Sequence, residues 1–234
     1  FKLRDLIALH GIEVFSSNYA LYGNLSARVM SVLRDLAPRI EVYSIDEAFL
    51  DLTGLQEPLP LYGRRVKADV QRLTGIPVGV GIAPTKTLAK LANHVAKSAV
   101  RKPGSYPEDL GYVCDLAALP ASDLDAVLAA TPVGDIWGVG RKIGAQLEEM
   151  GVANALQLAN LDPSLVRKRW SVVLERTVRE LQGQSCIALE DAAPAKQQIA
   201  CTRSFGQRIS ELPPLVEAVS AFASRASEKL RRQD

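Results

Sequence analysis

Residues 39–54 read Arg-Ile-Glu-Val-Tyr-Ser-Ile-Asp-Glu-Ala-Phe-Leu-Asp-Leu-Thr-Gly. Apolar and polar residues alternate along 40–44 and again along 48–52, on either side of a short polar corner. Two alternating runs around such a corner are typical of a β-hairpin. The corner carries two consecutive carboxylates, Asp46 and Glu47. Because neighbouring side chains on a regular strand point to opposite faces, only a turn or a distorted strand end lets both converge on one point.

A convergent carboxylate pair suits a hard divalent cation such as Mg²⁺, which prefers oxygen ligands. Asp46 and Glu47 are therefore a candidate metal site. A solvated turn is the simpler interpretation of an isolated Asp-Glu pair, because charged residues are common in turns. The apolar strands on both sides of the pair favour the metal site.

The composition is that of a globular protein of two or three small domains, with 234 residues of which 47% are hydrophobic. No apolar run approaches the length of a membrane-spanning helix, and the first residues do not form a signal peptide. The cysteines lack paired spacing, which favours reduced thiols over disulfides or zinc. We therefore expect a cytoplasmic protein with no membrane partner. Since the chain begins at Phe1 without Met, we expect it to be part of a longer polypeptide.

Charge is unevenly distributed, although the formal net charge is only +2. Between residues 64 and 102 the single acid is Asp69, and the basic residues are Arg64, Arg65, Lys67, Arg72, Lys86, Lys90, Lys97, Arg101 and Lys102. A concentrated basic stretch can bind a polyanion, and it can also be a solvated face. Charge alone does not decide between the two.

The order of predicted elements around the hairpin defines a fold class. Periodicity and caps predict a helix from Asn18 to Leu36, the hairpin, a helix over 60–74 and a strand over 78–83. This order is most of a βαββαβ ferredoxin-like unit whose opening strand is absent. A helix over 86–97 follows, capped by Thr85. Its lysines, Lys86, Lys90 and Lys97, share one face because offsets of four and eleven nearly close whole turns.

The segment Gly81-Ile-Ala-Pro-Thr-Lys-Thr follows a predicted strand and opens a helix, as a phosphate-binding P-loop does. It lacks the second glycine of that motif, and Pro84 removes a backbone N–H. We therefore exclude an NTPase site.

The second half of the chain is predicted to be mainly helical, with helices over 122–130, 141–150 and 171–182. Gly138 and Gly140 form a Gly-Val-Gly connection between the first two, which predicts a helix-hairpin-helix. Glycines let a backbone approach a phosphate, and the following helix N-terminus supplies free N–H groups. A plain helix turn is the alternative, and Arg141 and Lys142 favour the phosphate site. A linker over 184–198, a strand over 199–206 and a helix over 213–232 complete the prediction.

The string Ser-Ile-Asp-Glu-Ala-Phe resembles the catalytic motif of the Y-family (translesion) DNA polymerases. The match extends along the whole chain and is closest to the UmuC-like group, through Ser-Ser-Asn-Tyr (16–19), Val-Gly-Val-Gly-Ile-Ala (78–83), Thr-Lys-Thr-Leu-Ala-Lys-Leu-Ala-Asn-His (85–94) and Val-Leu-Glu-Arg-Thr-Val-Arg-Glu-Leu (173–181). The resemblance implies an α+β protein. Its expected parts are the end of the fingers (1–17), a ferredoxin-like palm (18–105), a helical thumb (106–183), a linker (184–198) and the start of the little finger (199–234).

The resemblance also implies an activity, namely DNA synthesis across damaged templates in an SOS-type response, by nucleotidyl transfer with two Mg²⁺ ions. Asp46 would ligate both ions and Glu47 one, and Lys97 would contact the triphosphate of the incoming deoxynucleotide. The residues expected to hold primer-template DNA are Gly138, Gly140, Arg141, Lys142, Arg203 and Arg208. A UmuD-like subunit and RecA are the protein partners that the resemblance implies.

The family uses a third metal-binding carboxylate, which lies upstream of Phe1 by resemblance. Asp51 cannot replace it, because five residues of extended strand separate it from Asp46 by roughly 16 Å. We therefore expect this chain to be inactive by itself. The alternative function is a non-catalytic DNA-binding or scaffold protein that kept the fold.

Overall fold

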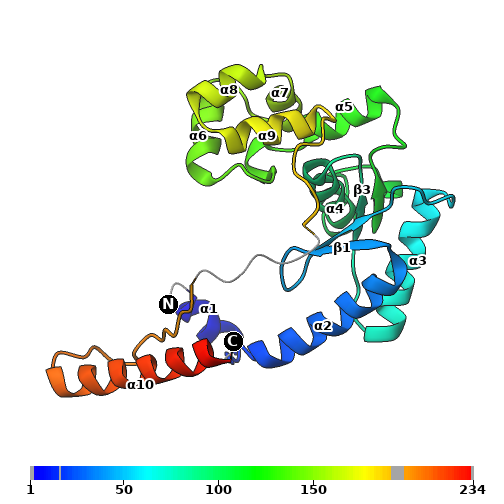
Figure 1. The fold of residues 1–234 in the computed structure, drawn as a ribbon. Helices are drawn as coiled ribbons and strands as arrows, with labels where there is room; N and C mark the ends of the chain where they lie inside the picture. The colour runs from blue at the N-terminus through cyan, green and yellow to red at the C-terminus, as the bar shows by residue number, and fades with distance from the viewer. Residues whose placement is uncertain (1–2, 16, 191–197, 233–234) are drawn as a thin grey trace. The chain divides into compact units, whose positions relative to one another are not determined.

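The computed structural model describes residues 3–15, 17–190 and 198–232. The chain divides into two compact units, residues 1–191 and 192–234 (Figure 1). The helices and strands of the first unit up to its fourth strand are α1 (Arg4–His10), α2 (Tyr19–Leu36), β1 (Arg39–Val42), β2 (Ala48–Asp51), α3 (Leu59–Thr74), β3 (Val80–Ile82), α4 (Lys86–Arg101), the 3-10 turn η1 (Glu108–Leu110) and β4 (Val113–Asp115). From Asn18 to the end of α4 the predicted order of helices and strands is confirmed, and β4 is an addition after it.

The remaining elements of the first unit are α5 (Ala121–Ala130), the 3-10 turn η2 (Val133–Asp135), α6 (Arg141–Glu149), α7 (Ala155–Ala159), α8 (Pro163–Arg169) and α9 (Val172–Leu181). The three helices predicted here correspond to α5, α6 and α9, and the sequence did not predict the short α7 and α8. The second unit contains α10 (Leu212–Arg231). No described helix is long and apolar enough to cross a membrane.

The strands form two separate sheets of two strands each. The predicted hairpin is confirmed, since β1 and β2 pair antiparallel with Val42 opposite Ala48 and Arg39 opposite Asp51. β3 is shorter than predicted and pairs in parallel with β4. Residues of β2 and β3 line a shared cavity of about 1390 Å³. One strand of each sheet therefore borders the same cavity.

Helices α2 and α3 pack together beside the cavity. Tyr62, Val66 and Val70 of α3 are buried and contact apolar residues of α2, including Leu33. The Tyr62 hydroxyl donates a hydrogen bond to the carbonyl of Leu36 at the end of α2. This small core holds the two helices against the start of β3.

Helix α4 is the centre of the larger core. Its inner face, with Leu88, Leu91 and Val95 among its buried residues, contacts the cluster that extends through α5 to α9. On its other side α4 lies so close to β3 that a Cβ atom on Gly81 would be 2.2 Å from the backbone nitrogen of Asn93 and 2.4 Å from the carbonyl oxygen of Ala89. Gly81 is therefore explained by the packing of β3 on α4.

A buried carboxylate fixes the start of α4 to the end of α9. Glu180 is fully buried. Its Oε2 accepts a hydrogen bond from the backbone N–H of Thr87 (2.8 Å), and its Oε1 accepts from Cys186 (3.1 Å) and Ile187 (3.0 Å). The hydroxyl of Thr85 donates to the backbone carbonyl of Glu180 (2.9 Å). Charge-assisted hydrogen bonds of this kind satisfy free N–H groups at a helix start.

The segment predicted as a linker has no helix or strand over its described residues, 184–190. It is nevertheless fixed to the first unit at both ends, because Glu180 holds Cys186 and Glu41 accepts a hydrogen bond from the backbone N–H of Glu190 (2.7 Å). Residues 191–197 of the predicted linker lie outside the described part of the chain.

The second unit differs from the prediction. The strand predicted over 199–206 is wrong, because residues 198–211 contain no strand. A strand needs a partner for its backbone groups, and the described part of this unit offers only α10. The Lys229 ammonium of α10 donates to the carbonyl of Ala200 (3.0 Å). The predicted helix over 213–232 is confirmed as α10.

Candidate functional site

The hairpin turn of residues 43–47 carries the carboxylate pair. The backbone N–H groups of Tyr43 and Ser44 both donate to the carbonyl of Glu47, at 3.1 and 3.0 Å. The Ser44 hydroxyl donates to Asp46 Oδ1 (2.7 Å) and accepts from the Asp46 N–H (3.4 Å). The turn thus fixes the Asp46 carboxylate locally. Both Asp46 and Glu47 line the cavity between the two sheets.

Glu47 forms an ion pair with α4. The Lys90 ammonium donates to Glu47 Oε2 at 2.7 Å, and the two side chains are 21% and 30% exposed. Lys90 was predicted only as one of three lysines on a face of α4. The structure instead places it against a candidate metal ligand.

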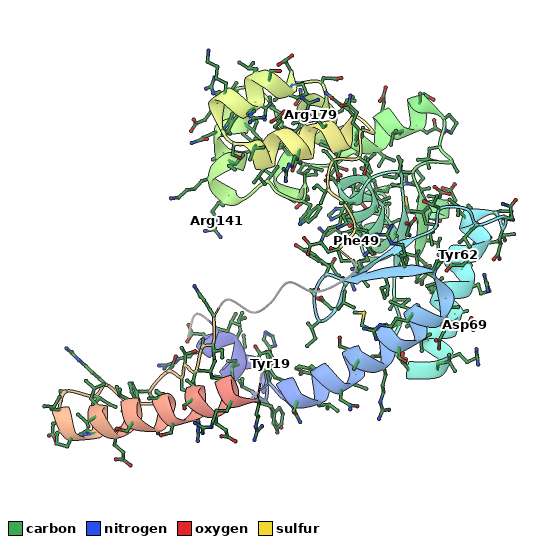
Figure 2. All side chains as sticks on the ribbon, viewed as in Figure 1. Tyr19, Phe49, Tyr62, Asp69, Arg141 and Arg179 are labelled. Atoms are coloured by element: carbon green, nitrogen blue, oxygen red, sulfur yellow. The ribbon has the colours of Figure 1, made fainter. Side chains whose placement is uncertain are left out.

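An aromatic group surrounds the same ammonium. The Lys90 Nζ lies 4.7 Å from the centroid of the Tyr43 ring and 5.6 Å from that of Trp137. The indole N–H of Trp137 donates to the Tyr43 hydroxyl (3.1 Å), and the ring of Phe49 lies 5.7 Å from Tyr43 and 6.0 Å from Trp137. Phe49 belongs to β2 and is labelled in Figure 2. We call Tyr43, Phe49 and Trp137 the aromatic cluster.

Lys86, one turn before Lys90, has a structural role. Its ammonium pairs with the buried carboxylate of Glu41 and donates to the carbonyl of Ala188 (2.7 Å). It also lies 5.0 Å from the centroid of the Phe49 ring. These contacts account for its charge and fix the 184–190 segment.

Lys97 lies two turns beyond Lys90 and lines the same cavity. Its Cγ is one of the atoms that a Cβ on Gly79 would contact, at 3.3 Å. Lys97 makes no hydrogen bond or ion pair with any residue that the structure describes. The neighbouring Asn93 Oδ1 is buried and also lacks a hydrogen-bond partner among these residues. Of these two polar groups, the Lys97 ammonium is the one available to a ligand in the cavity, because Asn93 Oδ1 is shielded from solvent.

The donor set of the turn fits a divalent cation in part. Asp46 Oδ2 and Glu47 Oε1 accept no hydrogen bond from the described residues. Within the same residues no group of three or more His, Cys, Asp or Glu could hold a metal. Mg²⁺ is commonly bound by one or two carboxylates together with water and substrate phosphates. The pair thus supplies part of a coordination sphere and leaves the rest to other ligands.

Asp51 is accounted for without a metal. It lies at the far end of β2, where its Oδ2 pairs with Arg39 (3.3 Å) and its Oδ1 accepts from the N–H of Thr53 (3.0 Å). Hydrogen bonds from the Thr53 side chain and backbone, with a smaller contribution from Arg39, lower the pKa of the Asp51 carboxyl. This agrees with the prediction that Asp51 does not join Asp46.

The Gly-Val-Gly connection precedes α6. Its two glycines differ in what a side chain at each position would meet. Gly138 has φ +92°, and a Cβ there would lie 2.6 Å from the Thr177 hydroxyl of α9, so its residue type is set by the backbone and by packing. Gly140 is the N-cap of α6, and a Cβ there would meet open space. Arg141 and Lys142 are exposed at this end of the helix, and Arg141 projects away from the ribbon (Figure 2).

Arg203 and Arg208 lie in the second unit, in the part without helix or strand, and both are exposed. Their proposed contact with DNA stays a prediction.

Sequence reasoning missed the aromatic cluster and the role of Lys90. The signal available was weak, since Tyr43 stands beside the carboxylate corner and Trp137 beside the Gly-Val-Gly connection. Only the fold brings these two residues together.

This chain is similar to known protein families, to individual proteins and to solved structures. Models of the impB/mucB/samB family match residues 2–94, its HHH motif matches 121–152 and its C-terminal domain matches 196–234. Protein UmuC of Salmonella typhimurium is 47% identical over 233 residues, covering 99% of this chain and 53% of that protein. Protein MucB of Escherichia coli is 46% identical over 235 residues, covering 100% and 54%.

Among solved structures, an insertion ternary complex of Dbh DNA polymerase matches with a TM-score of 0.57 and 24% identity, over 74% of this chain and 47% of that one. At this identity the likeness establishes the fold. The chain belongs to the impB/mucB/samB family, whose three models match separate stretches along it, and it is similar to UmuC and MucB. The predicted helix-hairpin-helix is confirmed by the motif match. The chain spans about half the length of the relatives it matches.

Proposed function

We propose that this chain carries the catalytic turn and part of the DNA-binding surface of a translesion DNA polymerase. The observation that carries the proposal is the Ser44-supported turn, which sets two carboxylates with unoccupied oxygens at a cavity. The membership of the UmuC-like family supports it. A DNA-binding scaffold would gain nothing from two carboxylates next to phosphate, because like charges repel.

Metal binding, nucleotide binding and DNA binding are assigned to residues at different positions in the structure. Asp46 and Glu47 would hold a pair of Mg²⁺ ions together with ligands that the described residues do not supply. Bound divalent ions activate the primer hydroxyl and stabilise the leaving pyrophosphate in such reactions. Lys97, which has no acidic partner among the described residues, would bind the triphosphate of the incoming deoxynucleotide. The exposed start of α6 would hold the phosphate backbone of the primer-template DNA.

The proposal includes a requirement and two partners. Because the resembled family uses a third metal-binding carboxylate and the described residues hold no group of three such ligands, we expect extension to need a further protein ligand and this chain alone to be inactive. A UmuD-like subunit and RecA are proposed as partners through the family resemblance alone.

Asp46→Ala tests the proposal in a polypeptide that extends primers. We expect extension to fall by about a hundredfold or more, since removing one group that stabilises transition-state charge costs several kcal/mol. DNA affinity should change little. Primer extension and DNA binding are measured for both proteins.

Asp51→Ala is the matched control, because Asp51 also lines the cavity but lies at the far end of β2. It should extend primers at nearly the wild-type rate. If the Asp46 variant retained activity within a few-fold of the wild type, the carboxylate turn would not be the catalytic site.

A further inference from the structure

The Lys90 ammonium is shared between a carboxylate and two aromatic rings. It lies 2.7 Å from Glu47 Oε2, 4.7 Å from the centroid of Tyr43 and 5.6 Å from that of Trp137. Four-fifths of its side chain is shielded from solvent. A cation over an aromatic face contributes about 0.5–2 kcal/mol, the more the less it is hydrated.

These contacts join two distant parts of the sequence. Tyr43 and Glu47 belong to the hairpin turn, whereas Trp137 directly precedes Gly138 of the Gly-Val-Gly connection. Trp137 and Tyr43 also share a hydrogen bond of 3.1 Å and pack edge to face with centroids 5.6 Å apart. The contact of the connection with the turn thus combines these direct ring contacts with the ammonium group that both rings share.

A divalent cation on Glu47 would change the balance of these attractions. Lys90 and the cation are both positive and would share one carboxylate, so they repel each other at close range. An ammonium that leaves Glu47 also leaves the rings. Lys86 provides the contrast, because its acid partner Glu41 lies outside the turn and a backbone carbonyl holds it as well.

We propose that Lys90 is a displaceable counter-ion of Glu47, and that its displacement by a divalent cation loosens the contact of Trp137 with the turn. The cation and the Gly-Val-Gly connection are then coupled, with a DNA-holding element responding to the filling of the carboxylate pair. The inference rests on the proposed function, since it needs the pair to bind a cation.

Trp137 is a direct reporter of this displacement. The chain has two tryptophans, so Trp170→Phe leaves Trp137 as the only one. This single-tryptophan chain is titrated with MgCl₂ in the millimolar range while emission is recorded, and binding is measured in parallel by calorimetry. We expect the emission of Trp137 to shift to longer wavelength, as water reaches the ring, along the same curve as calorimetric binding.

Lys90→Met in the same background removes the competitor. Calorimetric affinity for Mg²⁺ should rise roughly fivefold, as for the loss of a partly exposed ion pair. Emission should be shifted before any cation is added and then stay constant. Lys102→Met, an exposed change just beyond the same helix, should retain the affinity and the response of the parent.

The two measurements separate the possible failures. Mg²⁺ binding without any change in Trp137 emission would overturn the coupling and leave the proposed function standing. Weaker Mg²⁺ binding by Lys90→Met would overturn the counter-ion role. Absence of calorimetric Mg²⁺ binding to the parent chain would show that the carboxylate pair is not a cation site in this chain. The inference would then be wrong as well.

Discussion

Lys97 differs from the other two lysines on its face of α4 by its surroundings. Lys86 and Lys90 are neutralised by Glu41 and Glu47, whereas Lys97 meets no acid among the described residues. A half-buried ammonium next to a cavity and without a counter-ion favours binding of an anion. The sequence could group the three lysines but could not predict which two would be paired.

Lys97→Ala should therefore act on nucleotide binding. In a polypeptide that extends primers, we expect the apparent KM for the deoxynucleotide to rise roughly tenfold or more, as for the loss of a charge-assisted hydrogen bond. Affinity for primer-template DNA should change much less. Steady-state kinetics and a DNA-binding titration on the same variant give both numbers, and equal losses would mean that Lys97 acts only as general positive charge.

Gly81 is the residue on which the packing of β3 against α4 depends most closely. A methyl group there would lie within 2.4 Å of two backbone atoms of α4, and backbone cannot rotate away. We expect Gly81→Ala to destabilise the chain by about 1–3 kcal/mol or more, as for overpacking of a core. Thermal or urea unfolding measures the change in free energy.

Gly23→Ala is the matched control, because Gly23 lies inside α2 and a Cβ there would meet no atom within 4 Å. In a helix interior this change should stabilise by up to about 1 kcal/mol. A Gly81 variant as stable as the Gly23 variant would show that β3 and α4 can separate without cost.

At the scale of elements, α6 combines an exposed N-terminus with two exposed cations. Its first N–H groups follow Gly140, which has no neighbour that a Cβ would meet, and Arg141 and Lys142 stand at the same end. The sequence predicted both the helix and the connection. It could not predict that Gly138 is required by Thr177 of α9, a contact of two segments far apart in the chain.

Arg141→Ala combined with Lys142→Ala should weaken DNA binding about equally on unrelated sequences, since phosphate contacts carry no base information. Each lost contact lowers the slope of log K against log salt by roughly 0.9 on duplex DNA. Salt titrations of DNA affinity on two unrelated duplexes measure both effects. Unchanged slopes, or a loss on one sequence only, would remove the start of α6 from the DNA interface.

At the scale of the whole molecule, the sequence predicted what local patterns encode. Asn18 and Thr85 cap α2 and α4 as predicted, and Gly75, with φ +76°, ends α3. The three residues of β4 were missed because they are too few to show a period. A strand was wrongly predicted over 199–206, where an apolar pattern has no partner strand among the described residues.

The sequence predicted the two carboxylates of the candidate site. It did not predict the lysine and the aromatic residues that surround them. Asp46 and Glu47 are consecutive residues, so the sequence alone shows that they lie close together. The contact of Glu47 with Lys90 spans 43 residues, and that of Tyr43 with Trp137 spans 94. Such pairs depend on how the sheets and helices pack in three dimensions. The local periodicity of a sequence does not contain that information.

The cavity between β2 and β3 has a consequence for assembly. Within the described chain β2 pairs only with β1 and β3 only with β4, so each has one unpaired edge, and residues of both strands line the cavity. Open edges are templates for strand addition and for aggregation. One inserted segment could satisfy both edges together and become the centre of a continuous sheet. An extended segment supplied in trans that pairs with both edges should therefore raise the stability of this fold.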